Sequence, residues 1–481
     1  MKTKEIITTA NAAKSHYAQF HTTLDSYLYR FMSKFSPTVE SALGNRAKIF
    51  VPKTYSTIKR KVASLFETYL NADGIFTVSG NDAEVLNGAI NHYERNKPFK
   101  SVLTSVFYDF YIYGIGITRT FWSFEGPVVE RVDPRDFAFD VDAKSLGECR
   151  YFVHSYFVDG SVLDSYGVEK KVSKGLNKGI FSRYAVDDFY YFDNGWNVAS
   201  IHANAVFRTA LLRRHPFSFG YALAKIYEKY AMNGIDGVMY SNVYGDSECR
   251  VLAPLQDELN EIRSQMRDTT RDNLTPRILA ETGSGLSSYD WFNSAPGDVL
   301  YVNNLRSIQF APTPSVLQAS NEIKNLDLEI QEASGVTSYN SGISRAGMLN
   351  QTATGMSILT SEGNTKIAAE IRTVHETFFK DFGELYVSLV AAHAPKALMR
   401  GIRDRREVVY DVEIEIEKPG ENKELKKQRL VESLQLLGNI DPQSASTIAK
   451  DALLPMLVDA KTLEKLQGEQ NGLQQPTTVQ A

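Results

Sequence analysis

Cysteine is scarce in this chain: its 481 residues contain only two, Cys149 and Cys249. Their spacing matches no metal-binding motif. We therefore predict two reduced cysteines with a structural role, no bound metal and no cofactor. The alternative, a disulfide between them, would require the fold to bring the two residues together, and the sequence does not predict that proximity.

Long apolar runs are also missing. No run reaches the roughly 18 residues needed to cross a bilayer. The most apolar stretch, 107–117, contains Asp109 and two glycines, which favours a buried core element. The first residues lack the apolar region of a signal peptide. These absences predict a protein that is made and kept in a cytoplasm and has no membrane partner.

The chain has no surplus of positive charge, because 53 Lys and Arg face 57 Asp and Glu. Proteins that bind DNA regardless of sequence usually rely on such a surplus.

Signatures of catalysis are absent as well. The sequence has no Walker-type phosphate loop, no HExxH and no GxSxG. His375-Glu376 lacks a second histidine four residues away, which argues against zinc. Closely spaced carboxylates could in principle hold Mg²⁺ or Ca²⁺, but Val132-Asp133-Pro134 is typical of a turn after a strand, so we favour a structural role. These carboxylates are Asp133, Asp136, Asp140 and Asp142.

Two helices of about 20 residues are the strongest positive signal, each roughly 30 Å long. The first begins after Pro254 and ends at Thr275-Pro276. The second opens at Thr313-Pro314, and Gly335 stops it. Each has apolar residues along one helical face. They predict an antiparallel pair that holds the segment 277–311 at one end. The apolar positions are Leu255, Leu259, Ile262 and Met266, then Val316, Ala319, Ile323, Leu326, Ile330 and Ala333.

A third helix is predicted from Thr354 to His393, with a bend at 360–364, where glycine and poor helix formers gather. A polar loop, 337–351, precedes it and contains one charge, Arg345. The apolar face of this helix consists of Ile367, Ile371, Val374, Phe378, Phe382, Leu385 and Leu389.

The remaining segments predict a mixed domain. An aromatic-rich helix over 1–35 is expected to pack, and a neighbouring subunit is one candidate surface for it. Helices and strands alternate from 55 to 232, and alternation over 408–417 predicts a strand that returns to the sheet of this domain. Charged helices follow Pro419-Gly420, and the last dozen residues have a disordered composition.

The order of these elements resembles the portal (head-to-tail connector) proteins of tailed bacteriophages, most closely those of short-tailed phages. The resemblance covers roughly 47–419 and lies in the order of several short motifs. The matching segments are Pro254-Leu255-Gln256-Asp257-Glu258-Leu259-Asn260, Pro296-Gly297-Asp298-Val299, Gln351-Thr352-Ala353-Thr354-Gly355-Met356, Trp122, Glu130-Arg131-Val132-Asp133-Pro134-Arg135-Asp136 and Phe139-Asp140.

The resemblance implies an α+β fold with a mixed α/β wing, a helical stem pair, a small β-containing clip, a long bent helix and a helical C-terminal crown. The implied division is N-terminal arm and wing 1–253, first stem helix 254–274, clip 275–311, second stem helix 312–336, channel (tunnel) loop 337–353, long bent helix 354–398, wing return strand 399–418, and crown with disordered tail 419–481.

The implied function is structural: a ring, dodecameric in that family, at one capsid vertex. Its channel would carry double-stranded DNA during packaging and ejection. The implied partners are the terminase, the major capsid protein, the scaffolding protein and a head-tail adaptor, and the implied location is the virion, after assembly in the host cytoplasm.

The candidate residues follow from this division. Contacts to DNA in the channel are expected from Lys324, Asn340, Ser341, Arg345, Asn350 and Gln351. An acidic channel lining is expected from Glu322, Asp327, Glu329 and Glu332. Partner contacts of the clip are expected from Tyr289, Trp291 and Phe292. For the acidic residues the alternative is an ordinary solvated helix face, and Arg345 could equally be solvated.

Two other functions stay open at this level. A nucleic-acid-processing enzyme with a helical clamp would need a convergent acidic cluster or a nucleotide loop. A non-portal virion scaffold or coiled-coil protein would need longer apolar seams than the three or so heptads present here.

Overall fold

The computed structural model describes one part of the chain, and all of it lies in the first of two compact units, Met1–Glu415 and Ile416–Ala481. The sequence predicts a helix over 221–232, but its first four residues are not helical, since Leu223 forms a β-bridge with Asp246. The rest of this segment and the predicted crown lie outside the described residues. These residues are 2–44, 46–70, 74–80, 83–97, 99–160, 163, 183–224, 243–274, 278–281, 284, 286–287, 301–304, 306, 308–310, 317–336, 365–399 and 410–414.

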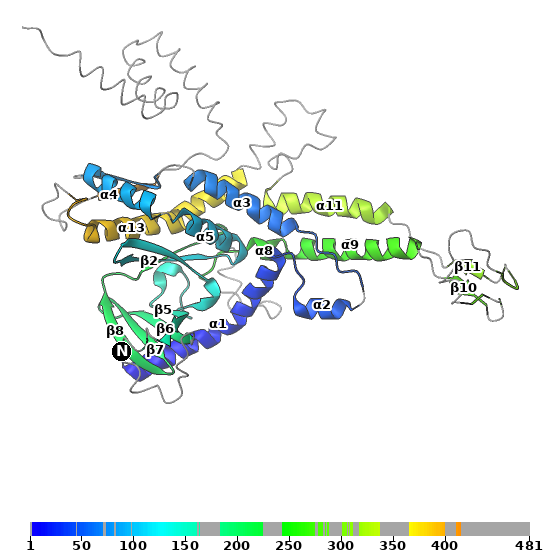
Figure 1. Ribbon diagram of the computed structural model, residues 1–481, viewed down its shortest axis with the longest axis horizontal. Helices are drawn as coiled ribbons and strands as arrows, with labels where there is room; N and C mark the ends of the chain where they lie inside the picture. The colour runs from blue at the N-terminus through cyan, green and yellow to red at the C-terminus, as the bar shows by residue number, and fades with distance from the viewer. Residues whose placement is uncertain are drawn as a thin grey trace, which may run out of the picture. The chain divides into compact units, whose positions relative to one another are not determined.

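Helices and antiparallel sheets are combined in this part of the chain, which confirms the predicted α+β class (Figure 1). Its largest sheet has five strands in the order β4-β5-β6-β7-β8. These strands are β4 Phe137–Phe139, β5 Tyr151–Asp159, β6 Arg183–Phe192, β7 Trp196–His202 and β8 Ala205–Leu212.

A second sheet of three strands has the order β3-β2-β9. Its strands are β2 Gly116–Ser123, β3 Gly126–Val132 and β9 Phe217–Gly220. The strands β2 and β3 form a hairpin, with Ser123 opposite Gly126 in the register. Gly126 has φ +130°, a conformation that favours glycine, which accounts for the turn at this position.

Helices pack around these sheets and share one large apolar core with them. Aromatic rings make much of this core, as where Tyr69 stacks on Phe379 with ring centroids 4.0 Å apart. The helices are α1 Thr3–Phe31, α2 Pro37–Leu43, α3 Lys53–Tyr69, α4 Ala83–Asn96 and α5 Lys100–Ile112. Short 3₁₀ turns lie at Pro134–Asp136 and Leu146–Glu148.

The aromatic stripe of α1 packs within its own chain. Tyr17, Phe20, Leu24 and Tyr27 are buried in the main core, and Phe20 meets Tyr244 with ring centroids 4.8 Å apart. A neighbouring subunit is therefore not needed to cover this stripe, which corrects that expectation. The helix ends at Phe31, and Pro37 occupies the first turn of α2, where Ser36 is the N-cap.

The predicted return strand is β12, Tyr410–Ile414, but its partner differs from the one expected. It pairs antiparallel with β1, Phe76–Gly80, in a separate two-stranded sheet. Val412 lies beside the core, and Gly383 of the long helix approaches it so closely that a Cβ there would be 3.2 Å from the Val412 side chain. The strand returns to the N-terminal region and joins neither of the larger sheets.

The long helix is described from residue 365 and continues as α13, Lys380–His393. A π-helical segment, His375–Phe379, interrupts it. Ile367, Val374 and Phe382 are buried as predicted, and Leu389 is half-buried. The predicted bend at 360–364 lies outside the described residues, and the sequence did not indicate the π segment.

Cys149 and Cys249 are both buried, and no disulfide joins them. Burial raises the pKa of Cys249, with a further contribution from the charge of Glu248. A thiol of this kind is unreactive, in keeping with a structural role. Within the described residues, no helix is long and apolar enough to span a membrane.

Candidate functional site

The two helices expected to form the stem pack against each other (Figure 1). They are α9, Ala253–Leu274, and α11, Leu317–Ser334, and α9 follows directly on the short helix α8, Glu248–Val251. The predicted apolar seams meet in a small separate core, and each fully buried aliphatic side chain in it contributes roughly 1.5–3 kcal/mol. Its members are the buried Leu252, Leu259, Leu326 and Ile330 and the partly buried Val51, Leu255, Ile262 and Ile323.

Gly335 ends α11 as predicted. Its φ is +73°, and its backbone N donates to Gln331 O at 2.9 Å. A Cβ at this position would lie 2.8 Å from Lys366 Cδ of the long helix, so glycine also permits that close approach. Lys366 Nζ donates to Glu332 O at 2.6 Å, which holds the long helix at the end of α11.

An extended segment, residues 46–52, lies along α9, and we call it the strap. Alternate backbone N–H groups of the strap donate to side chains spaced four residues apart on the helix. The three bonds are Ala47 N to Asp268 Oδ2 at 3.0 Å, Ile49 N to Ser264 Oγ at 3.1 Å and Val51 N to Asn260 Oδ1 at 2.8 Å.

Gln256 completes this ladder one helical turn further on. Its Nε2 donates to Val51 O at 2.7 Å and to Asn260 Oδ1 at 2.9 Å, and its Oε1 accepts from Thr54 N at 3.1 Å. Two extended residues advance about 6.6 Å and four helical residues about 6 Å, so the two repeats keep nearly in step over a few turns. The backbone hydrogen bonds of the strap are therefore made with side chains of a helix, whereas an extended segment normally makes them with a neighbouring strand.

The strap was not predicted. Its signal was present as polar residues at every fourth position of an amphipathic helix, namely Gln256, Asn260, Ser264 and Asp268. Polar positions on a helix usually face water. Here Gln256 and Asn260 are almost fully buried, and only the tertiary structure shows what they bind.

Asp327 is half-buried and forms an ion pair with Lys53, the first residue of α3. The other three acidic candidates, Glu322, Glu329 and Glu332, are exposed, and so is Lys324. Much of the Asp327 charge is thus compensated inside the chain, whereas the three glutamates present their charges to the surroundings. Asn340, Ser341, Arg345, Asn350 and Gln351 lie outside the described residues, as do Tyr289, Trp291 and Phe292.

The described part of the predicted clip forms a two-stranded antiparallel ladder, β10 Ile278–Ala280 with β11 Ile308–Phe310. Leu279 of this ladder is 57 % exposed, and Tyr301 is 89 % exposed. Apolar side chains so exposed are compatible with a surface that meets another protein.

A buried ionic cluster joins the start of the stem to the core. Lys61 Nζ of α3 donates to Glu248 Oε2 at 2.8 Å and to Glu370 Oε1 at 2.7 Å, and Tyr111 OH donates to Glu370 Oε2 at 3.0 Å. Burial raises the pKa of Glu248 even though Lys61 opposes the shift, and the negative charge of Glu370 adds to it. Residues from α3, α5, α8 and the long helix are thereby fixed together.

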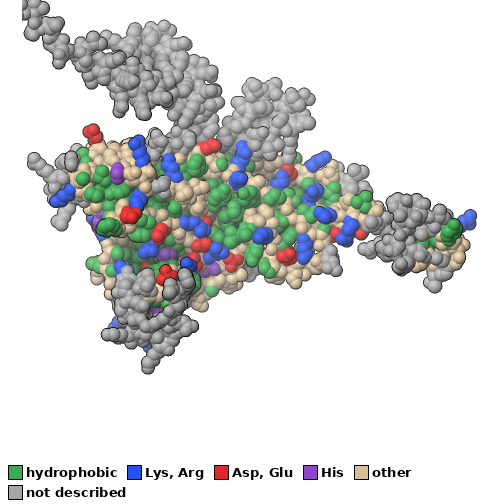
Figure 2. Space-filling view, in the orientation of Figure 1, with side chains coloured by type: hydrophobic (Ala, Val, Ile, Leu, Met, Phe, Trp, Pro, Cys, Tyr) green, Lys and Arg blue, Asp and Glu red, His purple; other side chains and the backbone are tan. Residues whose placement is uncertain are grey.

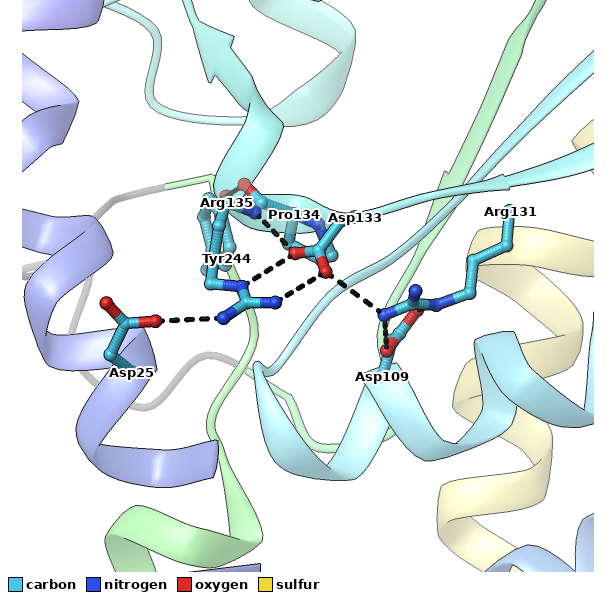
Figure 3. A network of polar contacts seen from close by, with 7 residues as sticks. All are labelled: Asp25, Asp109, Arg131, Asp133, Pro134, Arg135 and Tyr244. Atoms are coloured by element: carbon cyan, nitrogen blue, oxygen red, sulfur yellow. Dashed lines mark hydrogen bonds and ion pairs between the residues drawn. The ribbon is translucent and has the colours of Figure 1, made fainter. Parts of the chain in front are cut away.

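A second network occupies the turn that contained the candidate metal carboxylates (Figure 3). Arg131 donates to Asp109 through Nε at 2.5 Å and Nη2 at 2.8 Å. Arg135 donates to Asp133 through Nε at 3.0 Å and Nη2 at 2.8 Å, and it reaches Asp25 of α1 at 2.9 Å. Burial opposes ionisation of Asp133, but these arginine contacts outweigh it and lower its pKa.

The other carboxylates of that set are used in a similar way. Asp140 accepts from Arg150 Nε at 2.7 Å, and Asp142 accepts from Arg150 Nη2 at 3.1 Å. The Asp140 pKa is lowered because the hydrogen bonds and charge of Arg150 exceed the effect of burial. Burial raises the pKa of Asp136, with a further contribution from the charge of Asp133, and the charges of Arg135 and Arg131 oppose this shift only in part. Asp133, Asp140 and Asp142 are therefore bound by arginines of the same chain. This agrees with the structural role in turns that the sequence favoured.

Comparison with known families adds an independent finding. Residues 238–413, a little over a third of the chain, match the family described as Phage SU10 portal protein. The resemblance to short-tailed phage portal proteins is confirmed. The match begins before α8, includes α9, α11, β10 and β11, and ends within β12. The five-stranded sheet β4-β5-β6-β7-β8 lies outside the matched residues. No curated protein matches this chain.

Proposed function

We propose that copies of this portal-family chain form a closed ring whose channel passes double-stranded DNA into and out of a capsid. The observation that carries the proposal is the family match over 238–413, which coincides with the α9–α11 pair, the clip strands and the long helix. The role is structural, and we assign no catalytic residue and no cofactor.

The packing of the stem supports this role. The α9–α11 core is small and separate from the main core, and the strap and the Lys61 cluster anchor it on one side. A helix pair anchored in this way behaves as a stiff rod, and identical rods placed side by side can surround a central space. The subunit number expected from the family is twelve.

Within this proposal the earlier residue assignments remain predictions. The channel loop, with Asn340, Ser341, Arg345, Asn350 and Gln351, would contact DNA. Lys324 and the exposed glutamates of α11 would face the channel, and Tyr289, Trp291 and Phe292 of the clip would meet the packaging motor and later the tail adaptor. The capsid protein and the scaffolding protein are the remaining expected partners, at the capsid vertex of the virion.

The test is electron microscopy of the purified protein in negative stain, together with mass photometry. We expect rings with a central opening. Only monomers and dimers at micromolar concentration would contradict the proposal. Deleting residues 338–350 is expected to leave the rings intact and to impair DNA packaging or retention, whereas failure of the rings to assemble would give the loop a structural role.

The enzymatic alternative finds no support in the described residues. Its candidate carboxylates, Asp133 and Asp140, are held by different arginines in separate turns. Alanine at these two positions would discriminate, since the enzymatic alternative requires a metal-dependent nuclease activity that is lost in the variants.

A further inference from the structure

The α9–α11 pair has two lateral sides, and two contacts show which residues of the two helices share a side. Gln256 of α9 binds Val51 and Thr54, and Asp327 of α11 binds Lys53. Because 51–54 are consecutive, Gln256 and Asp327 mark the same side of the pair. Every other residue can be placed from them, since successive residues are about 100° apart around a helix.

Apart from Asp327, the charged side chains of α9 and α11 on the marked side are positive, and we call it the Arg side. Three arginines stand 7, 11 and 15 residues after Gln256, which places them within about 60° of its direction. Lys324 precedes Asp327 by three residues and lies about 60° from it. All four side chains are exposed: Arg263, Arg267, Arg271 and Lys324. Figure 2 shows Lys and Arg side chains, together with some Asp and Glu side chains, over the region of α9 and α11.

The opposite side carries negative charge, and we call it the Glu side. On α9 this side includes Glu258, Glu261 and Asp272, which follow Gln256 by 2, 5 and 16 residues. On α11 it includes Glu322, Glu329 and Glu332, which are 5, 2 and 5 residues from Asp327. These spacings correspond to about 140–200° around each helix. All of these residues are exposed except the half-buried Asp272.

Three of the four positive charges on the Arg side are not neutralised within the described chain. No ion pair in the described residues joins Arg263, Arg267 or Lys324 to a carboxylate, whereas Arg271 pairs with Asp268 at 3.8 Å. Interaction with the helix dipole does not explain the pattern either. Asp272 and Glu332 lie in the last turns of their helices, where a carboxylate is unfavourable.

We propose that the Arg side of one copy docks against the Glu side of the next copy, so that the stems form a head-to-tail contact around the ring. This proposal rests on the proposed ring. Two different, complementary surfaces on one chain are what a heterologous interface requires, whereas a two-fold dimer through either surface would place like charges together. This contact replaces the channel-facing position that the resemblance implies for Glu322, Glu329, Glu332 and Lys324, because these residues would then lie between subunits.

Charge reversal tests the interface. One variant, Arg263→Glu with Arg267→Glu, makes both sides acidic. A second, Glu322→Lys with Glu329→Lys, makes the acidic side of α11 basic. Arg, Lys and Glu are all good helix formers, so the helices are expected to persist, and circular dichroism checks this. Glu84→Lys with Glu376→Lys is the matched control, because both residues are exposed and lie away from the stem.

Each variant alone should raise the protein concentration needed for ring assembly by about tenfold or more, because like charges then face each other. The control should assemble like the wild type. An equimolar mixture of the two variants should regain assemblies in which the copies alternate, visible by mass photometry when one variant carries a mass tag. Regained assembly also shows that both variants are folded.

Other outcomes overturn the interface. Wild-type rings together with normal rings from each variant would refute it and leave the proposed ring intact. If those rings also had altered DNA retention, the charged sides would be assigned to the channel. Variants that fail to assemble alone and when mixed would likewise refute it. Wild-type protein that stays monomeric would remove the ring and this contact together.

Discussion

Val51 N donates a hydrogen bond to Asn260 Oδ1 at 2.8 Å, and this bond lies at the centre of the strap ladder on α9. Asn260 is buried and also accepts from Gln256 Nε2. The bond connects the residues that follow α2 with the first stem helix, more than 200 residues later. The position of the stem therefore depends on polar contacts as well as on its small apolar core.

Asn260→Ala is expected to destabilise the protein by about 1–3 kcal/mol, because it leaves two buried N–H donors without acceptors. Urea denaturation measures the change in the free energy of unfolding. Gln265→Ala is the matched control on the same helix, since its side chain bonds only the exposed Glu261 among the described residues. An equal change in both variants would show that the hydrogen bonds between Asn260 and the strap do not contribute to stability.

Lys61→Met is expected to cost about 3–5 kcal/mol, because it leaves Glu248 and Glu370 buried without their cation. Thermal unfolding followed by circular dichroism measures the loss. Adding Glu248→Gln and Glu370→Gln to Lys61→Met should recover part of it, since the site is then neutral. A triple variant no more stable than Lys61→Met would show that packing, and not charge, is what matters at this position.

Asp327→Asn is expected to reduce stability by about 0.5–1 kcal/mol, since it breaks a partly exposed ion pair with Lys53. Glu329→Gln, two residues away on the exposed side, should change stability little. Urea denaturation at low and at high salt measures the free energy of unfolding of both variants. The loss caused by Asp327→Asn should become smaller at high salt, because salt screens the ion pair, whereas the effect of Glu329→Gln should not change. Equal effects would contradict the pairing.

The stability of the protein is expected to depend on pH through Glu94. Burial raises the pKa of this carboxyl from 4.5 to about 7, despite hydrogen bonds from Ile75 and Phe76. The folded state therefore binds the proton more tightly than the unfolded state. The resulting stabilisation is complete below about pH 4.5 and is lost as the pH rises through about 7.

Glu94→Gln removes this titration and should flatten the dependence between pH 4.5 and 7, with a difference of up to roughly 3 kcal/mol. Unfolding midpoints across this range, for the variant and the wild type, measure it. Glu84→Gln on the same helix is the control, because Glu84 is exposed. If the stability of the wild type rose with pH over this range and Glu94→Gln left this dependence unchanged, the predicted direction of the effect would be wrong.

Gly220→Ala is expected to destabilise the protein by about 1–3 kcal/mol through overpacking. A Cβ at Gly220 would lie 2.4 Å from Phe378 Cβ and 3.0 Å from its Cα. Phe378 belongs to the π segment, and Thr377 Oγ1 of that segment also donates to Tyr221 O at 3.2 Å. Gly88→Ala in α4, where a Cβ would meet nothing within 4 Å, is the control and should be neutral or stabilising.

Much of the fold could be predicted because it follows from local patterns. The 3–4 spacing of Leu259, Ile262, Leu326 and Ile330 predicted two helices with one apolar face each, and these faces meet. Gly335 and the Thr275-Pro276 boundary predicted where the helices end. The π segment was not predicted. Its Thr377 contacts Tyr221, just after β9, and its Phe378 contacts Gly220 at the end of β9, more than 150 residues earlier. Contacts between segments so far apart cannot be seen in local spacing.

The sequence by itself determined the class of fold, the two stem helices and the resemblance to portal proteins, since periodicity and segment order are local properties. Only the tertiary structure decided that α1 packs on its own chain, that β12 pairs with β1, that Asn260 holds the strap and that Lys53 pairs with Asp327. The reason is physical: a polar residue on a helix has the same spacing whether it faces water or a distant part of the chain. Its partner is set by the packing of segments far apart in sequence.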